Sequence, residues 1–440
     1  MTFSQTPTYN LKAVLKETGM KPDVLRAWER RYGMPTPQRT PGGHRLYSQQ
    51  DVETLKWLLA RQGEGLSISR AVDLWREMQT GGRNPLAEYR QTAVSAPKTP
   101  TGPAAPTSLD AARREWLAAC LAFNEPLAEQ ALNQAFALYP VETVCVEVLE
   151  KGLAEMGGLW YESRASVQQE HFASGLVMRR LDALLAASPA PTRSQTVLIG
   201  CPPDEWHSFT SLLLALFLRR RGLNVIYLGA NVPDHRFEET VTTVGADLVV
   251  LVAQQLITAA ALQKTAAALS AHGVSVGYGG RIFSLQPDLQ KRIAGRFLGN
   301  DLVSALENID AVLVAPYHTV QAVLPEPGYV ETLQAFLSKR FLIDADLDKS
   351  AHIIQMPIEY THTAGQFLGD NMVAALCLGD MAFLDAEVDW LKALLEAQKL
   401  PFQLAHDYFQ VYLEVVRRQL DDRAAPIIAW LERQIELSKN

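Results

Sequence analysis

The chain has 440 residues, enough for two to four domains, and its composition of 48% hydrophobic and 20% charged residues is typical of a globular protein. It has no apolar run of the roughly 18 to 20 residues that span a membrane, and no basic-then-apolar start typical of a secretory leader. The four cysteines are scattered without metal-ligand spacing. The sequence therefore disfavours membrane and disulfide-rich secreted proteins and predicts a cytoplasmic one.

The charge is unevenly distributed along the chain. Residues 1–79 contain 12 Lys and Arg against 8 Asp and Glu, a net charge of +4, which leaves −11 for the rest of a chain whose total is −7. A basic N-terminal module on an acidic body is typical of a nucleic-acid-binding head joined to another kind of domain.

Residues 8–79 have the pattern of a winged helix-turn-helix domain. A short amphipathic helix stops at Gly19, a second helix covers residues 21–31 after a tight turn, and residues 37–47 predict a β-hairpin wing turned at Gly42-Gly43. Side chains on the second helix and the wing are candidates for contacts with double-stranded DNA. These candidates are Arg26, Arg30, Arg31, Arg39, His44, Arg45 and Tyr47.

Composition and apolar spacing change several times along the rest of the chain. Residues 80–107 are rich in Pro, Thr, Ala and Gly and predict a flexible linker. Residues 108–190 have helical apolar spacing and predict a bundle. Residues 194–315 alternate short apolar strands with helices, which predicts a parallel Rossmann-like α/β domain, and residues 316–440 predict a mostly helical domain. The predicted fold class is thus multidomain, α and α/β.

The N-terminal head resembles the MerR superfamily of transcriptional regulators. The matching residues are the run Leu25–Gly33, Pro37, Arg39 and the run Gly43–Tyr47. Relatives in that superfamily usually form dimers through a long helix directly after the head. Because a Pro-rich linker follows here, we expect the domains further along the chain to build the oligomer.

The next two domains resemble cobalamin-binding modules. Glu205-Trp-His207 follows the first predicted strand, and Gly279-Gly280 follows the fourth, at the strand ends where such sheets bind ligands. The resemblance implies that His207 is the lower axial ligand of cobalt and that Glu205 sets its tautomer. It also implies that Gly279 and Gly280 let the backbone approach the cofactor.

Two positions depart from the family's pattern. Thr210 stands where the family usually has a glycine, and Gln254 lies in the segment after the third strand where a small serine is common. These departures put the contacts of the cofactor's tail in question but not the fold.

Trp160 and the pair Glu170-His171 resemble the spacing found in CarH-type light-dependent repressors. The resemblance implies adenosylcobalamin as the cofactor, with Trp160 and Glu170 around its adenosyl group. It further implies that His171 takes the upper position on cobalt after light removes that group. The implied function is not enzymatic: a homo-oligomer, a tetramer or a dimer, binds operator DNA tightly in the dark and falls apart in light.

The region after Pro316 lies beyond the usual end of such repressors. We slightly favour a helical packing or oligomerisation domain. The alternative is a second sensory site, since photocobilins carry an added region that binds a bilin such as biliverdin, here without a covalent bond. The aromatic and imidazole side chains available for it are His352, His362, His406, Tyr360, Tyr408 and Tyr412.

Two other functions compete with a light-responsive repressor. A corrinoid carrier for methyl transfer explains Glu205-Trp-His207 but neither the DNA-binding head nor the Trp160 and Glu170-His171 set. A cobalamin-level or redox sensor without photochemistry explains all of them. A spectrum and an elution volume taken before and after green light distinguish the sensor from the photoreceptor.

Overall fold

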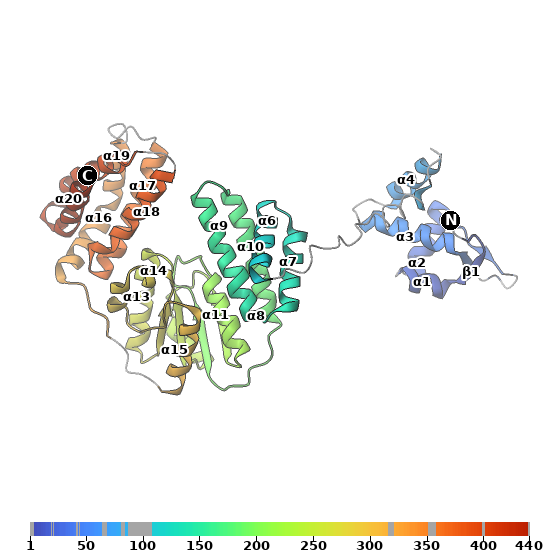
Figure 1. The fold of residues 1–440 in the computed structure, drawn as a ribbon, viewed down its shortest axis with the longest axis horizontal. Coiled ribbons are helices and arrows are strands. Elements are labelled where there is room, and N and C mark those ends of the chain that lie inside the picture. The colour runs from blue at the N-terminus through green and yellow to red at the C-terminus, as the bar shows by residue number, and fades with distance from the viewer. Residues whose placement is uncertain are drawn as a thin grey trace. The chain divides into compact units, whose positions relative to one another are not determined.

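A computed structural model places most of the chain (Figure 1). It describes residues 4–18, 20, 22–40, 43, 45–63, 68–80, 84–86, 108–315, 321–350, 358–397 and 401–438. The chain divides into two compact units, Met1–Ala105 and Pro106–Asn440. Most of the predicted linker lies outside the described residues, so the two units are treated separately.

The N-terminal unit has a helix-turn-helix and a small antiparallel sheet in strand order β1-β3-β2. Its elements are β1 (Pro7–Asn10), α1 (Leu11–Thr18), α2 (Pro22–Tyr32), β2 (Gln38–Arg39), β3 (Arg45–Ser48), α3 (Gln49–Gly63) and α4 (Ile68–Thr80). Pairing of β2 with β3 confirms the predicted wing, whereas β1 was not predicted from the sequence.

Helix α2 is amphipathic, which fixes the face it presents to solvent. Leu25 and Trp28 are buried three residues apart, while Arg26, Arg30 and Arg31 are exposed. Residues three and four apart share one face of a helix. The apolar face of α2 therefore anchors it in the core and turns its arginines outward.

The second unit begins with a four-helix arrangement. Its helices are α6 (Leu109–Leu121), α7 (Glu125–Leu138), α8 (Val141–Val144), η1 (Cys145–Glu150), α9 (Lys151–Tyr161) and α10 (Val167–Ala186), of which α8, η1 and α9 run on without a break. Ser108 caps α6, Asn124 caps α7, and a capping box of Ser166 and Gln169 starts α10. We call this part the bundle.

A five-stranded parallel sheet of order β5-β4-β6-β7-β8 follows the bundle. Its elements are β4 (Thr196–Gly200), α11 (Phe209–Arg220), β5 (Asn224–Gly229), α12 (Phe237–Val244), β6 (Leu248–Val252), α13 (Leu256–Ala271), β7 (Val276–Gly279), α14 (Arg281–Leu285), η2 (Pro287–Arg292), β8 (Arg296–Phe297) and α15 (Leu302–Val314). The four predicted strands are confirmed, and the two-residue β8 was missed. In this strand order the chain reverses direction across the sheet between β4 and β6, which is where doubly wound sheets bind ligands.

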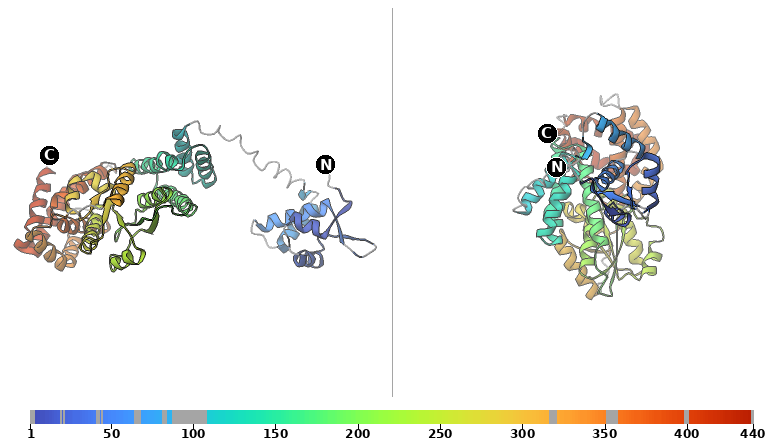
Figure 2. Two further views of the ribbon diagram at one scale, coloured as in Figure 1. Left: turned by 90° about the horizontal axis from the view of Figure 1, so that it is seen from below. Right: turned by 90° about the vertical axis from the view of Figure 1, so that its right-hand side faces the viewer.

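The two faces of the sheet belong to different cores, with helices on both sides (Figures 1 and 2). Successive side chains of a strand point to opposite faces. In β4, Leu198 packs into one core with α13, whereas Val197 and Ile199 pack into another with α11 and the bundle. This alternation fixes the bundle to one face of the sheet.

The described residues after Glu326 are mostly helical, as predicted. They form α16 (Pro327–Lys349), α17 (Ile358–Leu378), η3 (Met381–Leu384), α18 (Asp385–Ala397), α19 (Gln403–Leu420), η4 (Asp421–Ala424) and α20 (Ala425–Leu437). Buried residues of α16, α17 and α19 continue the core of the α13 face, and Gln286 donates a hydrogen bond to the carbonyl of Phe383 at 3.0 Å. Among the described residues, no helix is both long and apolar enough to cross a membrane.

Candidate functional site

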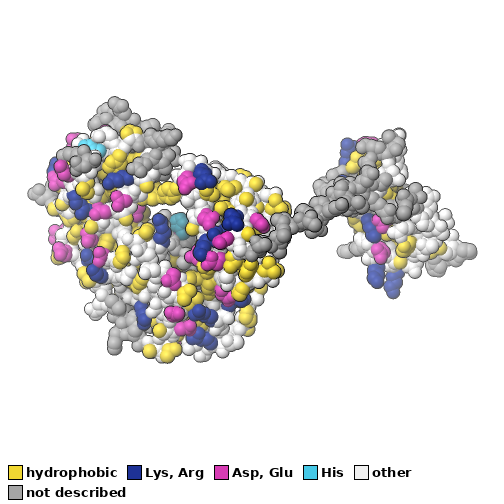
Figure 3. Space-filling view, viewed as in Figure 1, with side chains coloured by type: hydrophobic (Ala, Val, Ile, Leu, Met, Phe, Trp, Pro, Cys, Tyr) yellow, Lys and Arg dark blue, Asp and Glu magenta, His cyan; other side chains and the backbone are white. Residues whose placement is uncertain are grey.

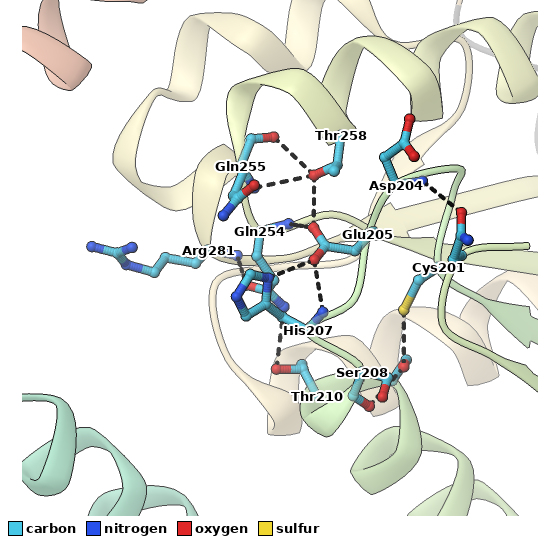
Figure 4. Close-up of polar contacts among 12 residues, drawn as sticks. Cys201, Asp204, Glu205, His207, Ser208, Thr210, Gln254, Gln255, Thr258 and Arg281 are labelled. Carbon is cyan, nitrogen blue, oxygen red and sulfur yellow. Dashed lines mark hydrogen bonds and ion pairs between the residues drawn. The ribbon is translucent and has the colours of Figure 1, made fainter. Parts of the chain in front are cut away.

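The loop between β4 and α11 presents an imidazole held by a buried carboxylate (Figure 4). Oε1 of Glu205 accepts a hydrogen bond from the backbone N–H of His207 at 2.9 Å and lies 2.8 Å from Nδ1 of its ring. Glu205 is fully buried, whereas the side chain of His207 is 62% exposed. The carboxylate thus engages one ring nitrogen and leaves Nε2 available to an incoming group.

Residues that follow the neighbouring strand β6 hold the Glu205 carboxylate in place. Its Oε2 accepts hydrogen bonds from the backbone N–H of Gln254 at 2.7 Å and from the hydroxyl of Thr258 at 2.6 Å. Gln254 and Thr258 follow β6, so the carboxylate lies at the β4–β6 reversal point. A buried charge is stable only when it is paired and hydrogen-bonded, as it is here. Neither Gln254 nor Thr258 was predicted to be a partner of this carboxylate.

The same contacts set the protonation of both groups. Burial alone would raise the pKa of Glu205, but hydrogen bonds from His207, Thr258 and Gln254 lower it below its ordinary value. The hydrogen bond with Glu205 raises the pKa of His207 against the opposing effect of burial, and the Glu170 carboxylate adds to the rise. An ionised carboxylate on Nδ1 is the arrangement that orients a histidine for metal binding through Nε2.

The two departures from the expected cobalamin-binding pattern contact each other. Nε2 of Gln254 donates to the Thr210 hydroxyl at 3.3 Å, and Oε1 of Gln254 accepts from the backbone N–H of Arg281 at 2.9 Å. Gln254 therefore ties the loops after β4, β6 and β7 together beneath His207.

The two glycines after β7 differ in their surroundings. A Cβ on Gly280, whose φ is +120°, would lie 1.9 Å from the carbonyl oxygen of Ala253, whereas a Cβ on Gly279 would meet nothing within 4 Å. Only glycine fits at position 280, because the backbone there passes too close to the backbone of Ala253 for any side chain. Gly279 faces open space at the carboxyl edge of the sheet, where it leaves room for a ligand.

The bundle brings the second predicted set of residues to the same edge. Trp160 lies near the end of α9, and Glu170 and His171 lie in the first turn of α10. Nδ1 of His171 is 2.7 Å from Oε2 of Glu170, and the His171 side chain is 76% exposed. The Glu170 carboxylate adds to the raised pKa of His207, so its charge lies within reach of the imidazole in the β4–α11 loop.

In the N-terminal unit, Glu29 of α2 joins the wing to the helix-turn-helix. It accepts hydrogen bonds from Nε of Arg45 at 2.9 Å and from the hydroxyl of Tyr47 at 2.6 Å. Tyr47 is fully buried, and burial together with Glu29 raises its pKa. Its predicted contact with DNA is therefore wrong for this conformation, because a buried ring orients Glu29 instead of touching a ligand.

The other predicted DNA contacts divide by exposure. Arg26, Arg30, Arg31 and Arg39 are exposed, whereas Arg45 is partly buried in its ion pair with Glu29. His44 and the predicted turn residue Gly42 lie outside the described residues.

We expect the Glu205→Gln substitution to lower the pKa of His207 toward its ordinary value near 6.5, because the amide removes the charge that stabilises the imidazolium. Histidine NMR titration of the cofactor-free protein measures this change. Since only the unprotonated Nε2 can bind a metal, metal binding by His207 should weaken as the pH falls through that pKa. An unchanged titration in the variant would contradict the role of Glu205.

Comparison with known proteins identifies the domains of the chain. The model described as "MerR HTH family regulatory protein" matches residues 9–77, and two models described as "B12 binding domain" match residues 112–185 and 195–303. The HTH-type transcriptional repressor CarH of Myxococcus xanthus is 34% identical over 242 residues, which are 55% of this chain and 77% of CarH. The repressor CarA of the same organism is 31% identical over 248 residues, 56% of this chain and 76% of CarA.

Among solved structures, the monomethylamine corrinoid protein of Methanosarcina barkeri is similar, with a TM-score of 0.41 and 14% identity over 46% of this chain and 100% of its own. Because CarH is matched over more than two thirds of its length at 34% identity, the relationship rests on sequence. The chain belongs to the family of cobalamin-binding, MerR-type transcriptional regulators that includes CarH and CarA.

Proposed function

We propose that this regulator is a light-responsive repressor that uses adenosylcobalamin as its chromophore. The observation that carries the proposal is the His207 imidazole, which is oriented by the buried Glu205 carboxylate and has the Glu170 carboxylate of the bundle near enough to raise its pKa. When bound, adenosylcobalamin supplies a cobalt–carbon bond that visible light breaks.

Each residue of the site has a distinct task in this proposal. Nε2 of His207 would hold the cobalt, because Glu205 engages Nδ1 of the same ring. Trp160 and Glu170 enclose the upper substituent from the bundle. Glu170 engages Nδ1 of His171, so Nε2 of His171 would be a second imidazole nitrogen that could bind the cobalt once light has removed the adenosyl group.

Assembly would connect the site to DNA. Each chain carries one head, with exposed Arg26, Arg30, Arg31 and Arg39. Joining two or four chains raises DNA affinity without any new contact, because the second head binds at high effective concentration. Loss of the oligomer in light would then release the operator.

The decisive experiment follows the spectrum, elution volume and operator binding of cobalamin-loaded protein in the dark and after green light. We expect all three to change together, with the protein smaller and DNA binding weaker after light. A changed spectrum with unchanged size and DNA binding would contradict the switch. No change in any of them would favour a cobalamin sensor without photochemistry.

We expect the Arg30→Ala substitution to weaken operator binding about tenfold and to reduce the salt dependence of the affinity by about one released ion. The reason is that Arg30 is exposed on α2 while the buried residues of that helix are unchanged. Titrations at several salt concentrations measure both quantities. Arg164→Ala, in the other unit, is the control. If the two variants bound the operator with equal affinity, α2 would not be the helix that contacts DNA.

A second candidate function is a dual-chromophore receptor that also binds a bilin such as biliverdin. The observation that favours it lies on α19, where the hydroxyls of Tyr408 and Tyr412 are buried without a hydrogen-bond partner among the described residues. Unpaired buried hydroxyls are unfavourable, so a ligand that pairs with them would be stabilised. His406 lies on the same helix as the two tyrosines and His362 lies on α17, whereas His352 and the side chain of Tyr360 lie outside the described residues. Absorption in the red after addition of biliverdin tests this function, and its absence would exclude it.

A further inference from the structure

The bundle and the C-terminal helices are packed separately on the two faces of the sheet. The core under α13 continues into α16, α17 and α19, whereas the core under α11 continues into the bundle. Figure 3 shows a recess between these two parts, with a histidine and a basic side chain visible inside it. Any direct contact across the recess therefore links two bodies that are otherwise joined through the sheet.

One such contact joins α18 to the end of α9. Nε1 of Trp390 donates a hydrogen bond to the hydroxyl of Tyr161. The Tyr161 ring packs edge-on against Trp160, with centroids 5.1 Å apart, and Trp390 packs against Phe367 of α17 at 5.6 Å. Four aromatic rings thus run from the C-terminal helices to the residue predicted to line the upper face of the cofactor.

Charged groups around this contact connect it to the lower half of the site. Burial raises the pKa of both Tyr161 and Glu387, and the charge of Arg281 opposes that rise in each, so both residues lie within reach of this charge. In Figure 4 the Arg281 side chain points away from Glu205 into the space between the bundle and the C-terminal helices. The backbone N–H of Arg281 donates to Gln254, whose own N–H donates to Glu205.

We propose that Trp390 and Tyr161 form a latch through which the C-terminal helices position Trp160 and the upper wall of the corrinoid site. The inference rests on the proposed cobalamin site. A contact of one hydrogen bond between two separately packed bodies is a place where local opening costs little. The latch therefore matters most for a corrinoid whose upper substituent is large enough to need that wall, and Trp390 is a positioning residue.

The test compares two variants of the full-length protein, each losing one indole N–H. Trp390→Phe removes the latch, whereas Trp430→Phe removes a matched hydrogen bond to Asp385 within the C-terminal helices. Dissociation constants are measured in the dark for adenosylcobalamin and hydroxocobalamin, which differ in the upper ligand. Hydrogen exchange of residues 151–161 is measured without cofactor.

We expect Trp390→Phe to weaken adenosylcobalamin binding about fivefold to tenfold, to leave hydroxocobalamin binding within about twofold, and to speed exchange in α9. Trp430→Phe should change neither the ratio of the two affinities nor the exchange of α9. Tyr161→Phe should reproduce Trp390→Phe, and the double variant should show no further loss.

The proposal is overturned if Trp390→Phe and Trp430→Phe give the same affinity ratio and the same exchange in α9. Failure of the unmodified protein to bind hydroxocobalamin would instead refute the proposed cobalamin site. In that case exchange in the cofactor-free protein still decides whether the latch exists.

Discussion

Replacing His207 with alanine is expected to reduce the affinity for cobalamin by about 100-fold or more, because the substitution removes the imidazole that we propose as the ligand of cobalt. Changing a residue that merely orients a metal ligand typically costs 10- to 100-fold, and loss of the ligand itself should cost at least as much. Equilibrium dialysis with hydroxocobalamin in the dark measures the effect and avoids any contribution of photochemistry.

The matched control for this prediction is His272→Ala. His272 is also an exposed histidine of the α/β domain, but its Nδ1 contacts the carbonyl of Ala268 at the far end of α13. Its replacement should leave cobalamin binding unchanged. If the His207 and His272 variants retained the cofactor equally well, ligation by His207 would be refuted, and the buried Glu205 would need another explanation.

The part of the site that the sequence revealed is local in the chain. Glu205 and His207 are two residues apart, directly after an apolar strand, so one short pattern places both on the edge of the sheet. The four strands were recognisable for the same reason, since each is a short apolar run with glycine or polar residues at its end. The fold therefore followed from short-range pattern, whereas the assignment of His207 to cobalt came from the family resemblance and stays a prediction.

The part that the sequence concealed depends on distant segments. Gln254 and Thr258 lie 49 and 53 residues from Glu205, and only the β4–β6 pairing brings them together. Nothing about a glutamine or a threonine after a strand indicates a carboxylate partner. Tyr161 and Trp390 are separated by 229 residues and meet only because the two faces of the sheet carry different helical domains.

Tyr47 shows that the burial of a side chain can be mispredicted from the sequence around it. An aromatic residue on a short wing with polar neighbours was expected at the surface, but the ring packs into the apolar core of the N-terminal unit. That core is built from helices that lie before and after the wing in the chain, so the burial of one wing residue could not be foreseen from its neighbours. Arg45, which lies opposite Arg39 in the wing, pairs with Glu29 of α2 and is therefore less available to DNA.

Replacing Gly280 with alanine is expected to lower the free energy of unfolding of the second unit by about 3 to 5 kcal/mol. The backbone there has φ +120° and ψ 163°, a conformation nearly restricted to glycine, and the added Cβ would overlap the carbonyl oxygen of Ala253. Urea unfolding followed by circular dichroism measures the loss, which should appear as a lower midpoint with an unchanged slope.

Gly279→Ala separates the two tasks assigned to this pair. The added Cβ would have no atom within 4 Å, and the φ of Gly279 is not positive. The free energy of unfolding of the variant should therefore be unchanged or higher by up to about 1 kcal/mol, because alanine restricts the unfolded chain more than glycine does. Its methyl group would nevertheless project into the space we assign to the cofactor, so cobalamin affinity should fall although stability does not. A variant that is as stable as the parent and binds cobalamin equally well would show that Gly279 does not contact the cofactor, and the requirement for glycine would then be confined to Gly280.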